Sequence, residues 1–205
     1  MSDHIIRDIA ALEARYGEVS QPARLKEIAY LHPHYAAFVK ASPFVVLASV
    51  GPHGLDASPR GDPAGFVEIV DDRTLLLPDR RGNNRLDSLR NILADPRVAL
   101  LFLVPGVGET LRVNGTAEIS VDPEHLNRMA MNGKSPATVL VIRIESVFFQ
   151  CAKALVRSGM WKPETQILRS ALPSTGEMLA AVTDQRIDGE KYDRELPPRL
   201  AATLY

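Results

Sequence analysis

The stretch FVVLASVGPHGLDASPRGDPAGFVEIVDDRTLLLPD, residues 44–79, decides the fold class of this chain. Its short apolar and β-branched runs predict four strands, at residues 44–50, 55–60, 66–70 and 74–77. Turn-forming residues separate these runs at 51–54, 61–63 and 71–72. Such short connections join antiparallel neighbours, because parallel strands need a long crossover. The stretch therefore predicts an antiparallel sheet.

The second half of the chain continues this pattern, with two helices inserted between strands. Further strands are predicted at 97–104, 109–121 and 138–151, and helices at 85–94 and after Asp122. Helical spacing also predicts helices at 3–15, from Ser20 to Leu31, and at 35–41, 152–157 and 176–184, whereas residues 186–205 give weak signals. Six or seven strands with few inserted helices favour a mainly β protein with flanking helices (α+β), an antiparallel barrel with helices at its side.

The composition excludes several classes of protein. The 205 residues carry 24 basic and 25 acidic side chains, so no broad basic surface exists to bind nucleic acid. The one cysteine, Cys151, rules out an internal disulfide, and no stretch is apolar over the ~18 residues that a membrane span requires. The first residues, MSDHIIRDIA, lack the apolar core of a signal peptide. We expect a cytoplasmic protein without nucleic-acid or membrane partners.

A turn rich in arginine is the strongest candidate for a binding site. Four arginines fall within eleven residues: Arg80, Arg81, Arg85 and Arg90. Asn83 or Asn84 is placed to cap the helix that follows, which leaves backbone N–H groups for an anion. The alternative is a solvated helix start whose arginines pair with Asp79 and Asp87. Residues 80–85, the arginine turn, thus predict a phosphate site or a charged surface loop.

Five residues elsewhere are further candidates, each with a structural alternative. Arg60 ends a predicted strand and is either a second phosphate contact or an edge arginine. Arg112 either reaches a ligand beside the barrel or pairs with an acid on the next strand. Lys153 and Arg157 are four residues apart and share one helical face. Trp161 either lies against a flat aromatic ligand or packs in a core or interface.

Familiar catalytic motifs are missing from the sequence. It has no dinucleotide-binding glycine motif, no P-loop and no G-x-S-x-G elbow. His32 and His34 have no further ligand cluster beside them, so no metal is expected. Cys151 follows large apolar residues and is predicted to be buried and inert. Catalytic residues therefore stay unassigned, and a phosphate site without an acid, base or nucleophile favours chemistry supplied by a cofactor.

Three stretches together resemble the pyridoxamine 5′-phosphate oxidase-like, FMN-binding split-barrel family, over about residues 30–165. They are FVVLASVGPHGLDASPRGDPAGFV (44–67), LLLPDRRGNNRLDSLRNILADPRVALLFLVPGVGETLRVNGTAEIS (75–120) and FFQCAKALVRSGMW (148–161). The resemblance is closest to a subgroup with a GNNR-x-D-S-x-x-N segment and a C-x-K-A-x-x-R-S segment. It implies a six-stranded antiparallel split barrel that forms a homodimer, with FMN in each of two clefts at the dimer interface.

The resemblance also implies which residues bind FMN. Arg60 matches a strand arginine that holds the phosphate, Arg112 lies on the strand that lines the flavin ring, and Lys153 belongs to a motif that approaches the cofactor from the partner subunit or supports the dimer. Trp161 is added as a candidate ring contact. The full set of expected cofactor-binding residues is Arg60, Arg81, Asn84, Arg85, Ser88, Arg112, Lys153, Arg157 and Trp161.

The chain departs from true oxidases of pyridoxamine phosphate in two places. RGDPAGF stands where those enzymes have R-x-x-L-L-K, and the ending RELPPRLAATLY lacks their substrate motif. We therefore expect an FMN-dependent oxidoreductase of unknown small-molecule substrate. The alternatives are a non-catalytic flavin-binding or sensing module, and a phosphate-ligand binding protein without flavin. The expected organisation is an N-terminal helical extension (1–42), an FMN-binding split-barrel domain (43–165) and a C-terminal helical or irregular tail packing on the barrel (166–205).

Overall fold

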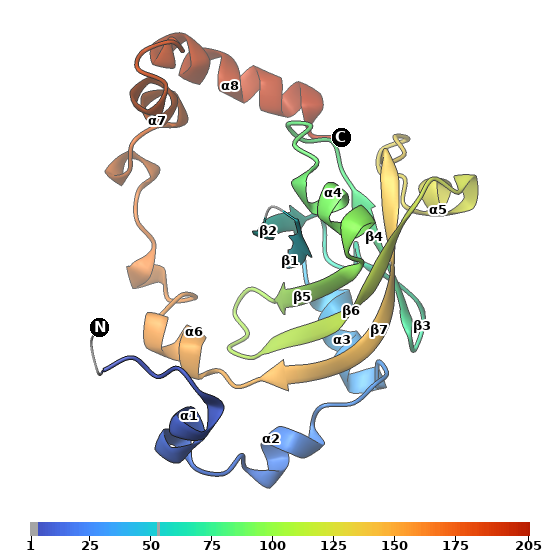
Figure 1. Ribbon diagram of the computed structural model, residues 1–205. Coiled ribbons are helices and arrows are strands. Elements are labelled where there is room, and N and C mark those ends of the chain that lie inside the picture. The colour runs from blue at the N-terminus through green and yellow to red at the C-terminus, as the bar shows by residue number, and fades with distance from the viewer. Residues whose placement is uncertain (1–3, 53) are drawn as a thin grey trace.

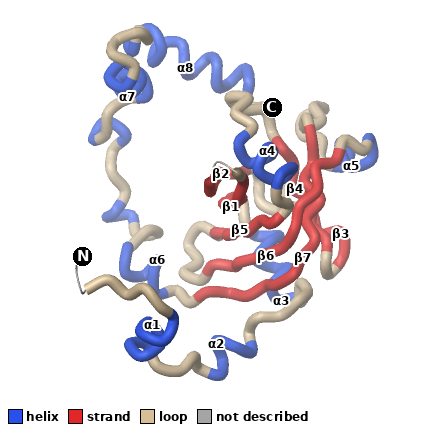
Figure 2. Tube along the Cα trace, viewed as in Figure 1, coloured by secondary structure: helices blue, strands red, loops and turns tan. Residues whose placement is uncertain are grey.

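The fold is seen in a computed structural model, which describes residues 4–52 and 54–205 (Figure 1). Within these residues, seven antiparallel strands form one curved sheet in the order β2-β1-β5-β6-β7-β4-β3 (Figure 2). The strands are β1 (Phe44–Gly51), β2 (Gly54–Gly61), β3 (Glu68–Asp71), β4 (Thr74–Asp79), β5 (Arg97–Leu103), β6 (Thr110–Ser120) and β7 (Thr138–Gln150). The turn predicted at 51–54 includes His53, which lies outside the described residues.

The predicted fold class, mainly β with flanking helices, is confirmed. The described residues form seven strands rather than the six that the resemblance implies. One of the seven, β3, is a four-residue edge strand that pairs only with β4. Short edge strands of this kind add hydrogen bonds to a sheet without changing its class.

The inner face of the curved sheet carries the main core. Burial alternates along β5 and β6, with Val98, Leu100, Leu111 and Val113 among the inward residues. They form one apolar cluster with inward residues of β1, β4 and β7. Residues 74–78 of β4 are buried without a break, because Leu76 packs on the opposite face with residues of and after α5 (Pro123–Arg128). This explains why LLLP (75–78) is a continuous apolar run in the sequence.

Two helices complete the core of the barrel. α3 (Pro33–Ala41) contributes Val39 to the inner cluster, and α4 (Asp87–Ala94) contributes Ile92. In Figure 1, α4 lies above β5 and α3 lies below it. Burying each such side chain stabilises the fold by about 1.5–3 kcal/mol. α4 is therefore fixed beside β1 and β2, directly after the arginine turn.

A β-bulge in β7, opposite Asn114 and Gly115 of β6, brings two backbones into close contact. The register between β6 and β7 shifts between Asn114 and Gly115. A Cβ atom on Gly115 would lie 1.9 Å from the Arg143 carbonyl oxygen, which no side chain tolerates. Glycine is thus required here because of the space available.

The N-terminal region differs from the predicted helices. α1 (Ile9–Tyr16) begins after Asp8, whose carboxylate accepts a hydrogen bond from the Ala11 N–H. α2 (Gln21–Leu25) ends well before Leu31, so the prediction of a helix from Ser20 to Leu31 is wrong. The reason is that Ile28 exchanges two backbone hydrogen bonds with Val147 of β7, at 3.1 and 2.8 Å, which a helix would have used internally.

The last part of the chain arches away from the barrel, and only its end returns to it (Figure 1). We call residues 159–205 the C-terminal arm. After α6 (Lys153–Ser158), the arm contains short 3-10 turns at Pro163–Thr165 and Arg169–Ala171, then α7 (Thr175–Val182) and α8 (Gly189–Thr203). α8 forms despite Pro197 and Pro198 in its interior, which explains why its sequence gave weak signals. The division of the chain into 1–42, 43–165 and 166–205 stays a prediction.

No helix found among residues 4–52 and 54–205 combines the length and apolar character needed to cross a membrane.

Candidate functional site

An open pocket of about 1140 Å³ lies where the ends of β2 and β4 meet the arginine turn. Leu204 and Tyr205 of the C-terminal arm also line it. The charged residues of its lining are Arg60, Arg80, Arg81, Arg85, Lys134, Asp62 and Asp79. Five cations and two carboxylates give the pocket an excess of positive charge. A pocket of this size holds a drug-sized or larger ligand, and its charge favours an anionic one.

Two ion pairs connect the end of β2 with the end of β4. The Arg60 guanidinium contacts the Asp79 carboxylate, and the Arg80 Nε donates to Asp62 Oδ2 at 2.6 Å. Arg80 Nη1 also donates to the Met129 carbonyl oxygen at 2.6 Å. Since β2 and β4 are not neighbours in the sheet, these side chains bridge its open side. The Arg80 guanidinium thus uses its donors to hold neighbouring segments together. The Arg60 guanidinium does so only through its contact with Asp79.

Arg60 has a hydrogen-bond donor left over. Its Nε is buried and has no hydrogen-bond partner among the described residues. A buried donor without a partner costs about 1–3 kcal/mol, more for a charged group. Asp79 fixes the other end of the guanidinium, so this N–H is held in place for an acceptor. A phosphate oxygen provides such an acceptor, and the residues present fit the phosphate of the implied cofactor.

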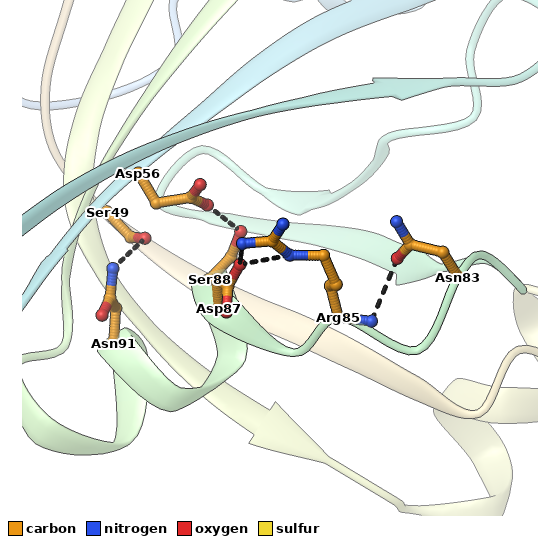
Figure 3. Close-up of polar contacts among 7 residues, drawn as sticks. All are labelled: Ser49, Asp56, Asn83, Arg85, Asp87, Ser88 and Asn91. Atoms are coloured by element: carbon orange, nitrogen blue, oxygen red, sulfur yellow. Dashed lines mark hydrogen bonds and ion pairs between the residues drawn. The ribbon is translucent and has the colours of Figure 1, made fainter. Parts of the chain in front are cut away.

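The arginine turn has a defined backbone. The Asn83 side-chain oxygen accepts a hydrogen bond from the Arg85 N–H at 3.0 Å (Figure 3). Asn84 adopts a left-handed conformation with φ 58°. Asparagine tolerates that conformation better than most residues. The Arg85 guanidinium contacts Asp87 at 2.8 Å but remains largely exposed. Arg81 is exposed, and no hydrogen bond or ion pair joins it to any residue that the structure describes.

The predicted capping of α4 is wrong. The helix begins at Asp87 rather than Arg85, and neither asparagine caps it: Leu86 is the N-cap residue, without a side-chain hydrogen bond. The Asn83 oxygen is already used by the Arg85 N–H, two residues further on, so it cannot reach the first turn of the helix.

Polar contacts hold α4 against β1 and β2 (Figure 3). The Ser88 hydroxyl is buried and donates to Asp56 Oδ2 at 2.5 Å, and Asn91 Nδ2 donates to the Ser49 hydroxyl at 3.2 Å. Ser88 does not line the pocket. The Ser88 hydroxyl already donates to the Asp56 carboxylate, whose negative charge repels an anion. The contacts of Ser88 and Asn91 therefore position α4 and do not bind a phosphate.

The structure brings four of the nine expected cofactor-binding residues together in the pocket: Arg60, Arg81, Asn84 and Arg85. The other five lie outside its lining: Ser88, Arg112, Lys153, Arg157 and Trp161. Arg112 lies over the Phe148 ring at 5.3 Å, rather than beside an acid on the next strand. The Trp161 Nε1 donates to the Val107 carbonyl oxygen at 2.8 Å. The roles of all nine stay predictions.

Sequence reasoning missed Tyr205, which lines the pocket. Its hydroxyl donates to Asp62 Oδ1 at 2.7 Å, and Lys134 Nζ donates to its backbone oxygen at 2.9 Å. The Arg80 guanidinium carbon lies 5.8 Å from its ring centroid. The hydrogen bond to Asp62, together with burial, raises the pKa of Tyr205 above its ordinary value of 10.0. Tyr205 and Asp62 are 143 positions apart, so no local pattern signals this contact.

Cys151 is exposed, so the prediction that it is buried is wrong. β7 ends at Gln150, which places the cysteine in the connection to α6 rather than in the sheet. In the part of the chain that the structure describes, no group of three or more His, Cys, Asp or Glu side chains is arranged to hold a metal ion.

The barrel and its arginine-lined pocket define an antiparallel β protein with a candidate anion site. The family model for pyridoxamine 5′-phosphate oxidase matches residues 31–151, more than half of the chain. The protein therefore belongs to the pyridoxamine 5′-phosphate oxidase family. A search of curated proteins found no match to the sequence.

Several solved structures are similar to this one. A variant of HupZ from Group A Streptococcus has 17% identity and a TM-score of 0.49, covering 58% of this chain and 99% of its own. A putative pyridoxamine 5′-phosphate oxidase from Lactobacillus delbrueckii has 24% identity and a TM-score of 0.42, covering 59% and 95%. An FMN-binding protein from Syntrophomonas wolfei has 13% identity and a TM-score of 0.42, covering 65% and 90%.

Proposed function

We propose that the pocket binds FMN through its 5′-phosphate and that the protein is an FMN-dependent oxidoreductase acting on a small molecule. Membership of the family and the resemblance to its FMN-binding members support the cofactor. The observation that carries the proposal is the buried Arg60 Nε, a donor without a partner among the described residues, in a pocket with excess positive charge.

The arginines have different tasks in this proposal. Arg60, held by Asp79, donates to a phosphate oxygen from a fixed position. Arg81 and Arg85 are exposed and approach the phosphate from the turn. Each charge-assisted hydrogen bond contributes about 1.5–3 kcal/mol to binding. Two such contacts together contribute about 3–6 kcal/mol.

When bound, the flavin supplies hydride or electron transfer, and the chain supplies binding and orientation. We propose that a second copy of the chain completes the site, because Arg112, Lys153, Arg157 and Trp161 lie outside the pocket of their own chain. A homodimer with FMN at its interface would bring residues of one chain to the cofactor of the other. Light scattering at several protein concentrations measures this, and a monomer throughout contradicts it.

Thermal unfolding with added ligands tests the cofactor. A ligand that binds the folded state raises the melting temperature, so FMN should raise it more than riboflavin or inorganic phosphate at equal concentration. Arg81→Ala should reduce the shift, whereas Arg97→Ala should not, because Arg97 pairs with Asp95 outside the pocket. The absence of any FMN shift, in protein purified without flavin, contradicts the proposal.

Reductive titration then separates an oxidoreductase from a flavin-binding module. We expect NADH or NADPH, or a small organic donor, to bleach the flavin absorbance of the FMN-loaded protein within seconds to minutes. If only a strong artificial reductant bleaches it, the protein binds FMN without turnover. If phosphate esters without a flavin ring shift the melting temperature as much as FMN does, the protein binds a phosphorylated ligand of another kind.

A further inference from the structure

Tyr205 is held at the pocket by three separate parts of the barrel. Asp62, in the segment after β2, accepts its hydroxyl hydrogen bond, and Lys134, before β7, donates to its backbone oxygen. Arg80, after β4, lies over its ring and is itself bound to Asp62. The Asp62 carboxylate is nearly fully buried, at 2% exposure. A buried carboxylate needs such partners, so Asp62 joins the pocket wall to the C-terminal arm.

The rest of the arm makes no such contacts with the barrel. In the described residues, no hydrogen bond or ion pair joins residues 162–204 to the sheet or to the helices that pack on it. α7 and α8 instead pack on each other, where Gly176 and Gly189 approach closely and Ser174 and Asp193 form a hydrogen bond. The arm is therefore attached near Trp161 at one end and at Tyr205 at the other.

An arm attached in this way is able to detach from the barrel at Tyr205 while it stays attached near Trp161. Releasing Tyr205 breaks a few polar contacts, and neither Leu204 nor Tyr205 belongs to the inner core cluster. Leu204 and Tyr205 line the pocket, so their displacement widens its mouth. Segments with few buried contacts are the ones that open locally in native proteins, and lids of this kind often set the rate of ligand release.

We propose that α8 and Tyr205 form a lid on the arginine pocket, closed by the Tyr205 hydroxyl on Asp62, and that this lid sets the rates at which FMN enters and leaves. The proposal rests on the proposed function, since it names FMN as the ligand. Tyr205 acts as a retaining residue of the site, and no chemical step is assigned to it.

Stopped-flow fluorescence tests the lid by measuring the association and dissociation rates of FMN. Tyr205→Phe removes the hydroxyl and keeps the ring, and Tyr205→Ala removes both. We expect both rates to rise by about tenfold in Tyr205→Phe, as the loss of a hydrogen bond to a charged group implies, and further in Tyr205→Ala. Tyr192→Phe, on the same helix but outside the pocket, should match the wild type. Unchanged association and dissociation rates in the Tyr205 variants would overturn the lid. A rise in the dissociation rate alone would also overturn it, because that result indicates that Tyr205 only contacts bound FMN.

Hydrogen exchange without ligand separates failure of the lid from failure of the proposed function. In Tyr205→Phe, we expect faster exchange in residues 199–205 and 131–137 than in the wild type, with the strands unaffected. If FMN does not bind but this difference is seen, the lid stands and the choice of ligand is wrong. If exchange in both segments equals that of the wild type, the lid is refuted whether or not FMN binds.

Discussion

Arg60 at the end of β2 and Asp79 at the end of β4 form an ion pair across the open side of the barrel. Their strands are separated in the sheet order by β1, β5, β6 and β7. A neighbouring ion pair makes the same connection with the charges reversed: the carboxylate, Asp62, follows β2, and the guanidinium, Arg80, follows β4. The two pairs place a fixed guanidinium beside the arginine turn, and its buried Nε has no hydrogen-bond partner among the described residues.

Arg60→Lys should weaken FMN binding by about 10–100-fold, because lysine keeps the charge but loses the fixed planar donors. Riboflavin affinity should change little. Arg97→Lys is the matched control, since Arg97 is exposed and pairs with Asp95 outside the pocket. Isothermal titration measures both dissociation constants. An Arg60→Lys protein that binds FMN as the wild type does would show that Arg60 makes no phosphate contact.

Arg85→Ala should weaken FMN binding more than riboflavin binding. Arg85 lines the pocket, is largely exposed and pairs only with the half-buried Asp87, so its guanidinium is available to a phosphate. The expected loss is about 1.5–3 kcal/mol for FMN. Fluorescence titration with the two flavins checks this. Equal losses for both flavins would place Arg85 at the shared part of the cofactor, and no loss for either would mean that it does not contact the cofactor.

Ser88→Ala should lower stability without lowering affinity. The variant leaves the Asp56 carboxylate without its buried partner, at a cost of about 1–3 kcal/mol in the free energy of unfolding. The dissociation constant for FMN should stay within about twofold. Ser170→Ala, in an exposed part of the arm, serves as the control. Denaturant unfolding and FMN titration separate the two effects, and the reverse pattern would assign Ser88 to the phosphate.

Gly115→Ala should destabilise the barrel by about 1–3 kcal/mol or more, because its Cβ collides with the Arg143 carbonyl oxygen. Gly82→Ala should change the free energy of unfolding by less than about 0.5 kcal/mol, since no atom lies within 4 Å of its added Cβ. Urea unfolding measures both. Similar stability of the two variants would mean that the bulge in β7 is not fixed by this contact.

The contact of Tyr205 with Asp62 should weaken in alkaline solution. Asp62 and burial raise the pKa of Tyr205 above 10.0, and Arg80 partly opposes them. The folded state therefore favours the neutral phenol. This stabilising contribution is fully present below pH 10, where unfolded tyrosine is neutral too, and is lost as pH rises through the raised pKa. The absorbance difference between wild type and Tyr205→Phe near 295 nm follows the ionisation, and a midpoint at or below pH 10 would contradict the contact.

Local patterns were sufficient to predict the barrel. Strands such as β1 and β5 alternate in burial as their sequences do, and proline and glycine mark the turns between them. Helix ends were predicted less well, because they depend on distant partners. α2 stops early since Ile28 pairs with Val147, and α4 starts late since Asn83 bonds to Arg85.

The pocket was predictable only in part, for a similar reason. Clustering in the sequence signals Arg81, Asn84 and Arg85, and the strand end before a break signals Arg60. Lys134 and Tyr205 have no such signal, because only the folding of the chain brings them to the pocket. Ser88 lies close to the arginine turn in sequence, yet its hydroxyl donates to Asp56 and the residue does not line the pocket.

Parallel titration of the wild-type protein with FMN and riboflavin tests the central claim most directly, because the two ligands differ only by the phosphate. Two charge-assisted contacts imply that FMN binds at least about 100-fold more tightly than riboflavin. Equal affinity for the two flavins, or no binding of either, would contradict the assignment of the arginine pocket to the FMN phosphate.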